Sequence, residues 1–212
     1  SPWYKDSYAL LQSGGLEPAE NEQCLAIHGC TPTQLLAEHG LLSDRFTSVH
    51  ATHLSDDDIA LYGRHACVIC MCPTTERDLA DGIGPARRLV EAGATLSLGS
   101  DSHAVIDLLE EARAVELDER LASQVRGHHS SVSLLRAATN HACLGRTDAG
   151  RIAVGQRADL VSVRLDSVRT AGTGTGPEVA VFAASAADVH HVVAGGRVVV
   201  RDGHHVDLDV PA

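Results

Sequence analysis

The sequence predicts a parallel α/β fold followed by a β tail, and three observations support this prediction. Between residues 46 and 124, short apolar stretches typical of buried strands alternate with segments that carry helix start and stop signals. Such alternation is typical of a parallel sheet covered by helices. Beyond about residue 150 the chain becomes glycine-rich and strand-like, which predicts antiparallel strands. A chain of 212 residues has room for one or two domains.

Two short helices are predicted near the N-terminus. The first is expected at residues 20–28. Thr31 followed by Pro32 is typical of an N-cap with proline at the first helical position, and Gly40 ends this second helix. Residues 1–15 show no clear periodicity and remain an unassigned start.

The middle of the chain predicts three strands, each followed by a helix. The strands are expected at residues 46–50, 67–71 and 95–98, and the helices after Ser55, at 85–90 and at about 105–124. Ser55 precedes three aspartates, which predicts an N-cap and an acidic first turn where the helix dipole favours negative charge.

The last third of the chain predicts one helix and then β structure. The expected elements are a helix at 131–142, a strand after Ala158, a flexible glycine loop at 171–176 and a hairpin at 189–193 and 197–200. We therefore place a boundary near residue 147, dividing the chain into residues 16–147 and 148–212.

Composition and charge exclude several classes of protein. The chain has 17 basic and 28 acidic residues, a formal net charge of −11, and it has no basic run, which argues against a nucleic-acid partner. No apolar stretch approaches the roughly 18–20 residues that span a bilayer, so we expect no membrane partner. The segment at residues 1–5 is not followed by the apolar core of a signal peptide. We expect a cytoplasmic protein.

Three of the six cysteines lie close together. Cys67, Cys70 and Cys72 fall on or beside the predicted strand at 67–71. No second cysteine or cysteine–histidine pair follows at zinc-finger spacing, which favours reduced, packed thiols over a zinc knuckle. Alternation along a strand would place Cys67 on one face and the other two on the opposite face.

The strand ends supply the candidate catalytic residues. In parallel α/β folds, catalytic groups lie at the carboxyl ends of the strands. His50 follows the first predicted strand and Asp101 follows the third. A carboxylate there can bind a metal or take a proton, and a neighbouring histidine can shuttle that proton. The alternative is that Asp101 caps the next helix and His50 is a hydrogen-bonded rim residue.

Other titratable residues are weaker candidates. His53 and His103 are expected to support the site or to start a helix, and Glu76 is predicted either to bind substrate or to cap a loop. The histidine pairs at 128–129, 190–191 and 204–205 are interpreted as surface residues. The last two lie in or beside the predicted β tail, where neighbours on a strand point to opposite faces and cannot easily chelate one ion, and the first lies in a loop before a helix. A serine hydrolase is not expected, because no serine lies in a nucleophile elbow.

Four motifs carry a resemblance to a known family: Val-His-Ala-Thr-His-Leu at 49–54, Cys-Pro-Thr-Thr-Glu at 72–76, Gly-Ser-Asp-Ser-His at 99–103, and the glycine-rich stretch at 150–161 that ends in Ala-Asp-Leu-Val. Through them the chain resembles the C-terminal half of amidohydrolase-superfamily enzymes, most closely the formimidoylglutamate deiminases of histidine degradation. The last motif is shared with guanine deaminases and triazine hydrolases.

The resemblance implies a fold, a cofactor and a reaction. The fold would be about strands 6 to 8 of a (β/α)8 TIM-type barrel, followed by a small β-sandwich segment. His50 would end the sixth strand and help to activate water. Asp101 would end the eighth strand, bind catalytic zinc and move a proton toward the leaving ammonia. The reaction would convert N-formimidoyl-L-glutamate to N-formyl-L-glutamate and ammonia.

The chain also departs from the family pattern. The family's His-x-His pair and a third zinc-binding histidine have no match, so Asp101 is the one expected zinc ligand present. Three interpretations follow: a deiminase whose N-terminal half is supplied elsewhere, a non-catalytic remnant or association module, or another amidohydrolase deaminase or chlorohydrolase. A partial barrel leaves open strand edges, so we expect a homo-oligomer or dependence on a complementary half.

Overall fold

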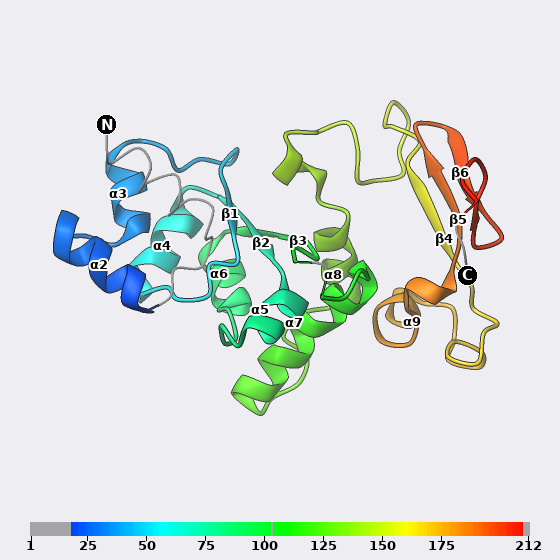
Figure 1. Cartoon of the computed structure of the whole chain (residues 1–212), viewed down its shortest axis with the longest axis horizontal. Helices are drawn as coiled ribbons and strands as arrows, with labels where there is room; N and C mark the ends of the chain where they lie inside the picture. The colour runs from blue at the N-terminus through cyan, green and yellow to red at the C-terminus, as the bar shows by residue number, and fades with distance from the viewer. Residues whose placement is uncertain (1–17, 103, 210–212) are drawn as a thin grey trace.

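The computed structural model describes residues 18–102 and 104–209, so the unassigned start at 1–15 and His103 lie outside the described residues. Two sheets organise this part of the chain: a three-stranded parallel sheet ordered β1-β2-β3 and a four-stranded antiparallel sheet ordered β4-β5-β6-β7. Figure 1 shows helices around the first sheet and the second sheet at the far end of the molecule. The predicted α/β fold with a β tail is confirmed.

Two N-terminal helices, α2 (Pro18–His28) and α3 (Pro32–Glu38), begin the described chain. Thr31 caps α3 as predicted: its hydroxyl accepts from the Gln34 N–H at 3.2 Å, and the Gln34 side chain accepts from the Thr31 N–H at 2.9 Å. Thr31 also donates to Asp58 of the next helix. One local capping signal thus starts α3 and fixes its position on its neighbour.

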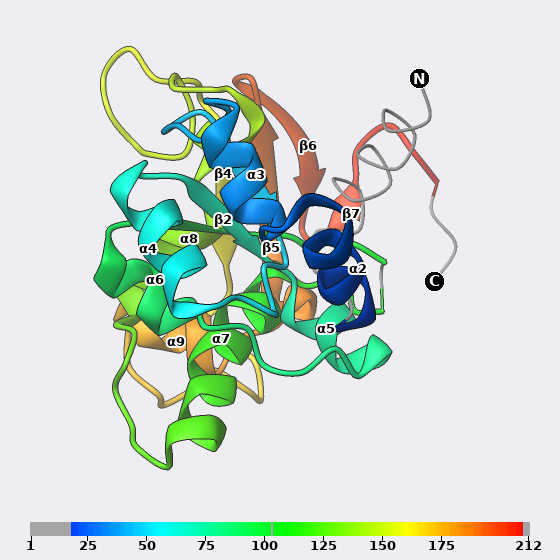
Figure 2. The same cartoon turned by 90° about the vertical axis from the view of Figure 1, so that its left-hand side faces the viewer.

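The parallel sheet and its helices follow the predicted order. The strands are β1 (Thr47–Val49), β2 (Val68–Met71) and β3 (Thr95–Leu98), and the helices are α4 (Asp56–Arg64) after β1, α5 (Pro73–Leu79) and α6 (Ala86–Ala92) after β2, and α7 (Leu108–Ser123) after β3. Val49 pairs with Cys70, which pairs with Ser97, so the three strands end at one edge of the sheet. Figure 2 shows α4 and α6 side by side against this sheet.

Helix α5 was not predicted, because its seven residues carry little periodicity and a contact from another helix helps to fix its start. Cys72 stands at its N-cap and makes no side-chain capping bond. Instead Glu111 of α7, which is fully buried, accepts from the Thr74 N–H at 3.0 Å and from the Thr74 hydroxyl. A carboxylate from another element therefore satisfies one of the free N–H groups of the first turn.

One hydrophobic core joins these elements. It contains Ile69 of β2, Leu89 of α6, Val115 of α7 and Leu134 of α8 (Ser131–Ala138). Val181 of α9 (Pro177–Phe182), a helix that was not predicted, belongs to the same core. A segment beyond the predicted boundary near residue 147 thus packs with the segment before it.

The tail contains the predicted hairpin and two short additions. The short helix η1 (His141–Leu144) precedes the tail, whose strands are β4 (Leu160–Val163), β5 (Val189–Ala194), β6 (Arg197–Arg201) and β7 (His204–His205), with the short helix η2 (Ala186–Asp188) before β5. The hairpin β5–β6 is confirmed, whereas β7 was not expected because two residues carry no periodicity. The glycine loop at 171–176 contains Gly172 and Gly174 at φ values of +77° and +105°, and it ends at α9.

The parallel sheet has open sides in the described part of the chain. There, β1 and β3 each pair with β2 alone. Several large apolar side chains are exposed, among them Ile106, Leu121, Leu144, Ile152 and Val168. None of the described helices is both long and apolar enough to cross a membrane. These features are consistent with the expectation that the chain associates with itself or with a complementary half, which remains a prediction.

Candidate active site

His50 occupies a strained position immediately after β1. Its N–H donates to the Cys70 carbonyl at 2.8 Å, which extends the sheet by one residue. The chain then turns, with φ values of 64° at His50 and 52° at Ala51. Left-handed conformations cost non-glycine residues about 1–3 kcal/mol each and persist where the surroundings hold them, often at functional sites. In this conformation the His50 side chain is largely buried.

Asp101 lies opposite His50, after β3. It too has a left-handed backbone, with φ 45°. Its Oδ2 lies 3.4 Å from Nε2 of His50, and its side chain is 44% exposed. The structure therefore brings together the two residues predicted to be catalytic. The alternative that Asp101 caps the following helix is wrong, because Asp107 caps α7 by accepting from the Leu109 and Glu110 N–H groups.

Glu76 of α5 is the second acidic neighbour of His50. Its Oε1 lies 3.3 Å from Nδ1 of His50 and accepts from the Cys72 N–H at 2.9 Å. Through the contact with Cys72, Glu76 caps the start of its own helix, whereas the predicted role in binding substrate stays a prediction. Sequence reasoning had not paired Glu76 with His50, because the pairing depends on where α5 begins. The imidazole thus lies between a buried and an exposed carboxylate.

The two carboxylates change the acidity of His50. The hydrogen bond with Glu76 raises the pKa of His50, and the negative charges of Glu76, Asp101 and Asp81 act in the same direction, whereas burial opposes them. The folded chain therefore binds the imidazole proton more tightly than the unfolded chain does. This contribution to stability is fully present below the ordinary histidine pKa and is lost as the pH rises through the raised value.

Thr75 ties the loop after β3 to helix α5. Its hydroxyl donates to the Ser100 carbonyl at 3.0 Å, and the Ser102 N–H donates to the Thr75 oxygen at 3.1 Å. The two hydroxyls of Thr75 and Ser102 are 3.0 Å apart. These bonds hold the residues on either side of Asp101, so the carboxylate position is set by α5 as well as by β3.

The cysteines of β2 are divided between two faces, as predicted. Cys67 is fully buried in the core, and Cys72 is also buried. A side chain added at Gly99 would lie 3.3 Å from the sulfur atoms of both Cys70 and Cys72, so these two thiols share a face. A hydrogen bond with Cys72 lowers the pKa of Cys70. The thiols fill the space beside the candidate site.

Three weaker candidates have different outcomes. His53 is half-buried in the loop between β1 and α4, and His103 lies outside the described residues. The interpretation of the 128–129 pair as surface residues is wrong for His129, which is buried. Its N–H donates to Glu116 at 2.7 Å, so the loop before α8 folds inward.

The pair at 190–191 was also misinterpreted. Both rings are partly exposed, as expected, but they do not diverge. Ser162 of β4 pairs with His191 and Val163 pairs with Val189, so His190 is the extra residue of a β-bulge. A bulge re-aims side chains locally, and both rings here reach Asp202. The alternation of side chains between the two faces of the strand is therefore interrupted at His190.

Comparison with known proteins identifies the family. The sequence profile of the Amidohydrolase family matches residues 12–199, which is most of the chain. The chain belongs to the amidohydrolase family. It is 34% identical to formimidoylglutamate deiminase from Pseudomonas aeruginosa over 88% of this chain and 43% of that protein. It is 32% identical to 5-methylthioadenosine/S-adenosylhomocysteine deaminase from Pelotomaculum thermopropionicum, over 90% of this chain and 45% of that protein.

Solved amidohydrolase structures agree with this assignment. An adenosine deaminase from Xanthomonas campestris with bound zinc superimposes with a TM-score of 0.85 at 28% identity, over 91% of this chain and 45% of that one. A variant of atrazine chlorohydrolase from Arthrobacter aurescens, complexed with zinc and atraton, gives a TM-score of 0.83 at 28% identity, over 92% and 44%. The chain thus spans less than half the length of these relatives.

The residues at the strand ends do not complete a zinc site by themselves. A catalytic zinc takes three protein ligands and a water molecule. Within residues 18–102 and 104–209, the one group of three potential ligands within 4.8 Å of one another is His190, His191 and Asp202, which excludes His50 and Asp101. Both ring nitrogens of His50 also face carboxylates. The remaining ligands of an active-site metal would have to come from outside the described residues.

A substitution at Glu76 tests the electrostatics of the site. Glu76→Gln keeps an oxygen that can accept from Cys72 and removes the charge beside His50, so we expect the pKa of His50 to fall toward the ordinary value. NMR titration of the His50 ring protons measures this change. Glu91→Gln, on the exposed side of α6, is the control and leaves the pKa unchanged. An unaltered His50 pKa in Glu76→Gln would contradict the assignment.

Proposed function

We propose that this chain is the C-terminal part of a zinc-dependent deiminase that converts N-formimidoyl-L-glutamate to N-formyl-L-glutamate and ammonia. The observation that carries the proposal is the placement of His50 between Glu76 and Asp101 at the ends of parallel strands. The 34% identity to formimidoylglutamate deiminase supports the substrate. In this proposal β1, β2 and β3 are barrel strands 6 to 8, and residues 148–212 contribute to the flanking β-sandwich.

The reaction consumes one water and releases one ammonia, so protons must move from the water to the leaving nitrogen. Glu76 fixes the imidazole of His50 through Nδ1 and leaves Nε2 directed at Asp101. His50 holds and returns a proton at Nε2, and Asp101, the more exposed group, passes a proton to the departing nitrogen. Zinc, when bound, supplies polarisation of the water, and Asp101 is the described residue that would ligate it.

A nucleoside deaminase is the second candidate. Several relatives are named as deaminases of 5-methylthioadenosine and S-adenosylhomocysteine, and a solved neighbour is an adenosine deaminase with bound zinc. These reactions also add water to the carbon of an N–C=N unit and then break its bond to the amino group, which leaves as ammonia. His50 and Asp101 would play the same roles in the nucleoside reactions. The two candidate functions therefore share their proton transfers and differ in their substrate.

Two hybrid enzymes distinguish these candidates. In each, this chain replaces the matching segment of a relative: the Pseudomonas aeruginosa deiminase in one and the Pelotomaculum thermopropionicum deaminase in the other. Ammonia release is measured with N-formimidoyl-L-glutamate and with 5-methylthioadenosine. We expect the first hybrid to act on N-formimidoyl-L-glutamate and the second to be inactive on the nucleoside.

The other outcomes are equally informative. Turnover of the nucleoside by the second hybrid, with an inactive first hybrid, would favour the nucleoside deaminase. Two folded, zinc-loaded hybrids without any turnover would support a non-catalytic remnant and overturn the proposal.

A further inference from the structure

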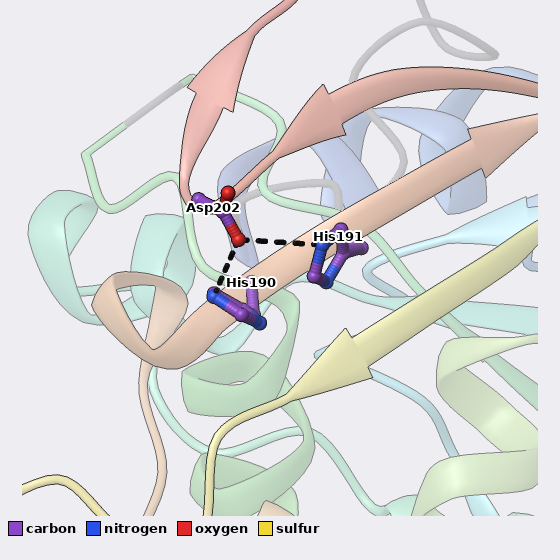
Figure 3. Close-up of side chains that lie close together, drawn as sticks. All are labelled: His190, His191 and Asp202. Atoms are coloured by element: carbon purple, nitrogen blue, oxygen red, sulfur yellow. Dashed lines mark ion pairs between the residues drawn. The ribbon is translucent and has the colours of Figure 1, made fainter.

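A second group of metal-ligand side chains lies in the antiparallel sheet (Figure 3). His190 and His191 come from β5, and Asp202 comes from the turn after β6. One oxygen, Asp202 Oδ1, lies 3.1 Å from Nε2 of His190 and 3.4 Å from Nε2 of His191. No residue of this group takes part in the contacts of His50, so the group needs an explanation of its own.

The backbone brings the two histidines to the same place. The bulge at His190 is the extra residue that β5 inserts opposite β4. It re-aims the side chain, as bulges do, and the two rings lie edge to face with centroids 4.2 Å apart. Figure 3 shows both rings turned toward the Asp202 carboxylate. The geometry of the sheet therefore makes the two rings converge.

The turn that carries Asp202 is attached to the same strand. Asp202 and Gly203 have φ values of 52° and 79°, as in the two-residue turns that join β-hairpin strands. The Gly203 N–H donates to the His190 carbonyl at 2.9 Å. This bond fixes the turn against the bulge, so the carboxylate and the imidazoles are positioned before any ligand arrives.

We propose that His190, His191 and Asp202 form a binding site for a divalent transition-metal ion of the zinc class. Two imidazole nitrogens and one carboxylate oxygen are a ligand set that such ions take. Zinc bond lengths at a tetrahedral angle separate neighbouring ligand atoms by about 3.3 Å. The two nitrogen–oxygen distances in the group, 3.1 and 3.4 Å, are close to this value.

The surroundings leave room for the rest of the coordination shell. The side chains of His190 and His191 are 36% and 39% exposed, and that of Asp202 is 69% exposed. Water can therefore occupy the remaining positions around the ion. An ion held here joins β5 to the turn after β6. Because it binds the folded chain and not the unfolded one, it raises the free energy of unfolding.

The test uses the 212-residue chain with Zn²⁺ and Co²⁺ as probes. Zn²⁺ affinity is measured by titration calorimetry, and Co²⁺ is followed by its visible absorption. Two variants remove a ligand: Asp202→Asn and His190→Gln. Asn is well tolerated in left-handed turns, so Asp202→Asn keeps the hairpin. His204→Gln is the matched control, because His204 lies on the same hairpin and its ring bonds to the backbone carbonyl of Asp202 and not to the carboxylate.

We expect the parent chain to bind one ion at this site. Asp202→Asn and His190→Gln should each bind it at least about ten-fold more weakly, and His204→Gln should bind it with the affinity of the parent. Cobalt bound at this site shows no thiolate charge-transfer band, which separates it from ions held by the cysteines. The proposal is overturned if Zn²⁺ and Co²⁺ do not bind, if both ligand variants retain the parent affinity, or if the cobalt spectrum shows thiolate ligation.

Discussion

Replacing Asp101 with Asn is expected to lower kcat of the active hybrid deiminase by about 10²–10⁴-fold, the contribution of a positioned acid or base. The amide has nearly the shape of the carboxylate but cannot accept the proton that His50 Nε2 presents 3.4 Å away. His50→Gln removes the other member of the pair, and we expect a loss in the same range. Steady-state measurement of kcat and KM checks both variants.

Asp57→Asn is the control for the loss of a negative charge. Asp57 is exposed in the first turn of α4, and its substitution should leave kcat unchanged. Near-normal turnover in the Asp101 or His50 variant would remove that residue from the mechanism. If the control also lost activity, the effect would come from net charge and not from proton transfer.

Gly63→Ala is expected to destabilise the fold strongly. Gly63 lies in α4, and a Cβ added there would lie 2.2 Å from the carbonyl oxygen of Ala92. That oxygen belongs to the backbone of α6, so the clash is removed only if α4 and α6 move apart. Although alanine is favoured over glycine in a helix by about 1 kcal/mol, we expect a net loss of about 1–3 kcal/mol or more. Urea unfolding measures the change in the free energy of unfolding.

A second substitution separates packing from helix propensity. Ala60→Gly, one turn earlier in α4, changes propensity without a backbone clash, and we expect it to cost about 1 kcal/mol. If close approach governs α4 and α6, Gly63→Ala costs more than Ala60→Gly, although propensity favours the opposite order. A Gly63→Ala chain as stable as the parent would show that α6 can shift to accommodate the methyl group.

Local signals were enough to predict the principal helices and strands. Ser55 caps α4 and Gly93 ends α6 where their chemistry predicts, because capping and left-handed turns depend on a few neighbouring residues. The short helices α5 and α9 were missed because contacts from α7 fix them: Glu111 holds the start of α5, and Arg113 donates to the Val181 carbonyl of α9 at 2.9 Å. Segments this short carry too little periodicity of their own.

The sequence by itself placed His50 and Asp101 at the same edge of the sheet, because parallel strands end at one edge whatever their packing. Only the tertiary structure decided that Glu76 takes the other side of the imidazole, since this depends on the position of α5 against α7. Likewise, only the register of β4 against β5 places the bulge that turns His190 toward Asp202. The type of each element and its place along the chain follow from local sequence patterns, whereas the direction of an individual side chain follows from hydrogen bonds to distant segments.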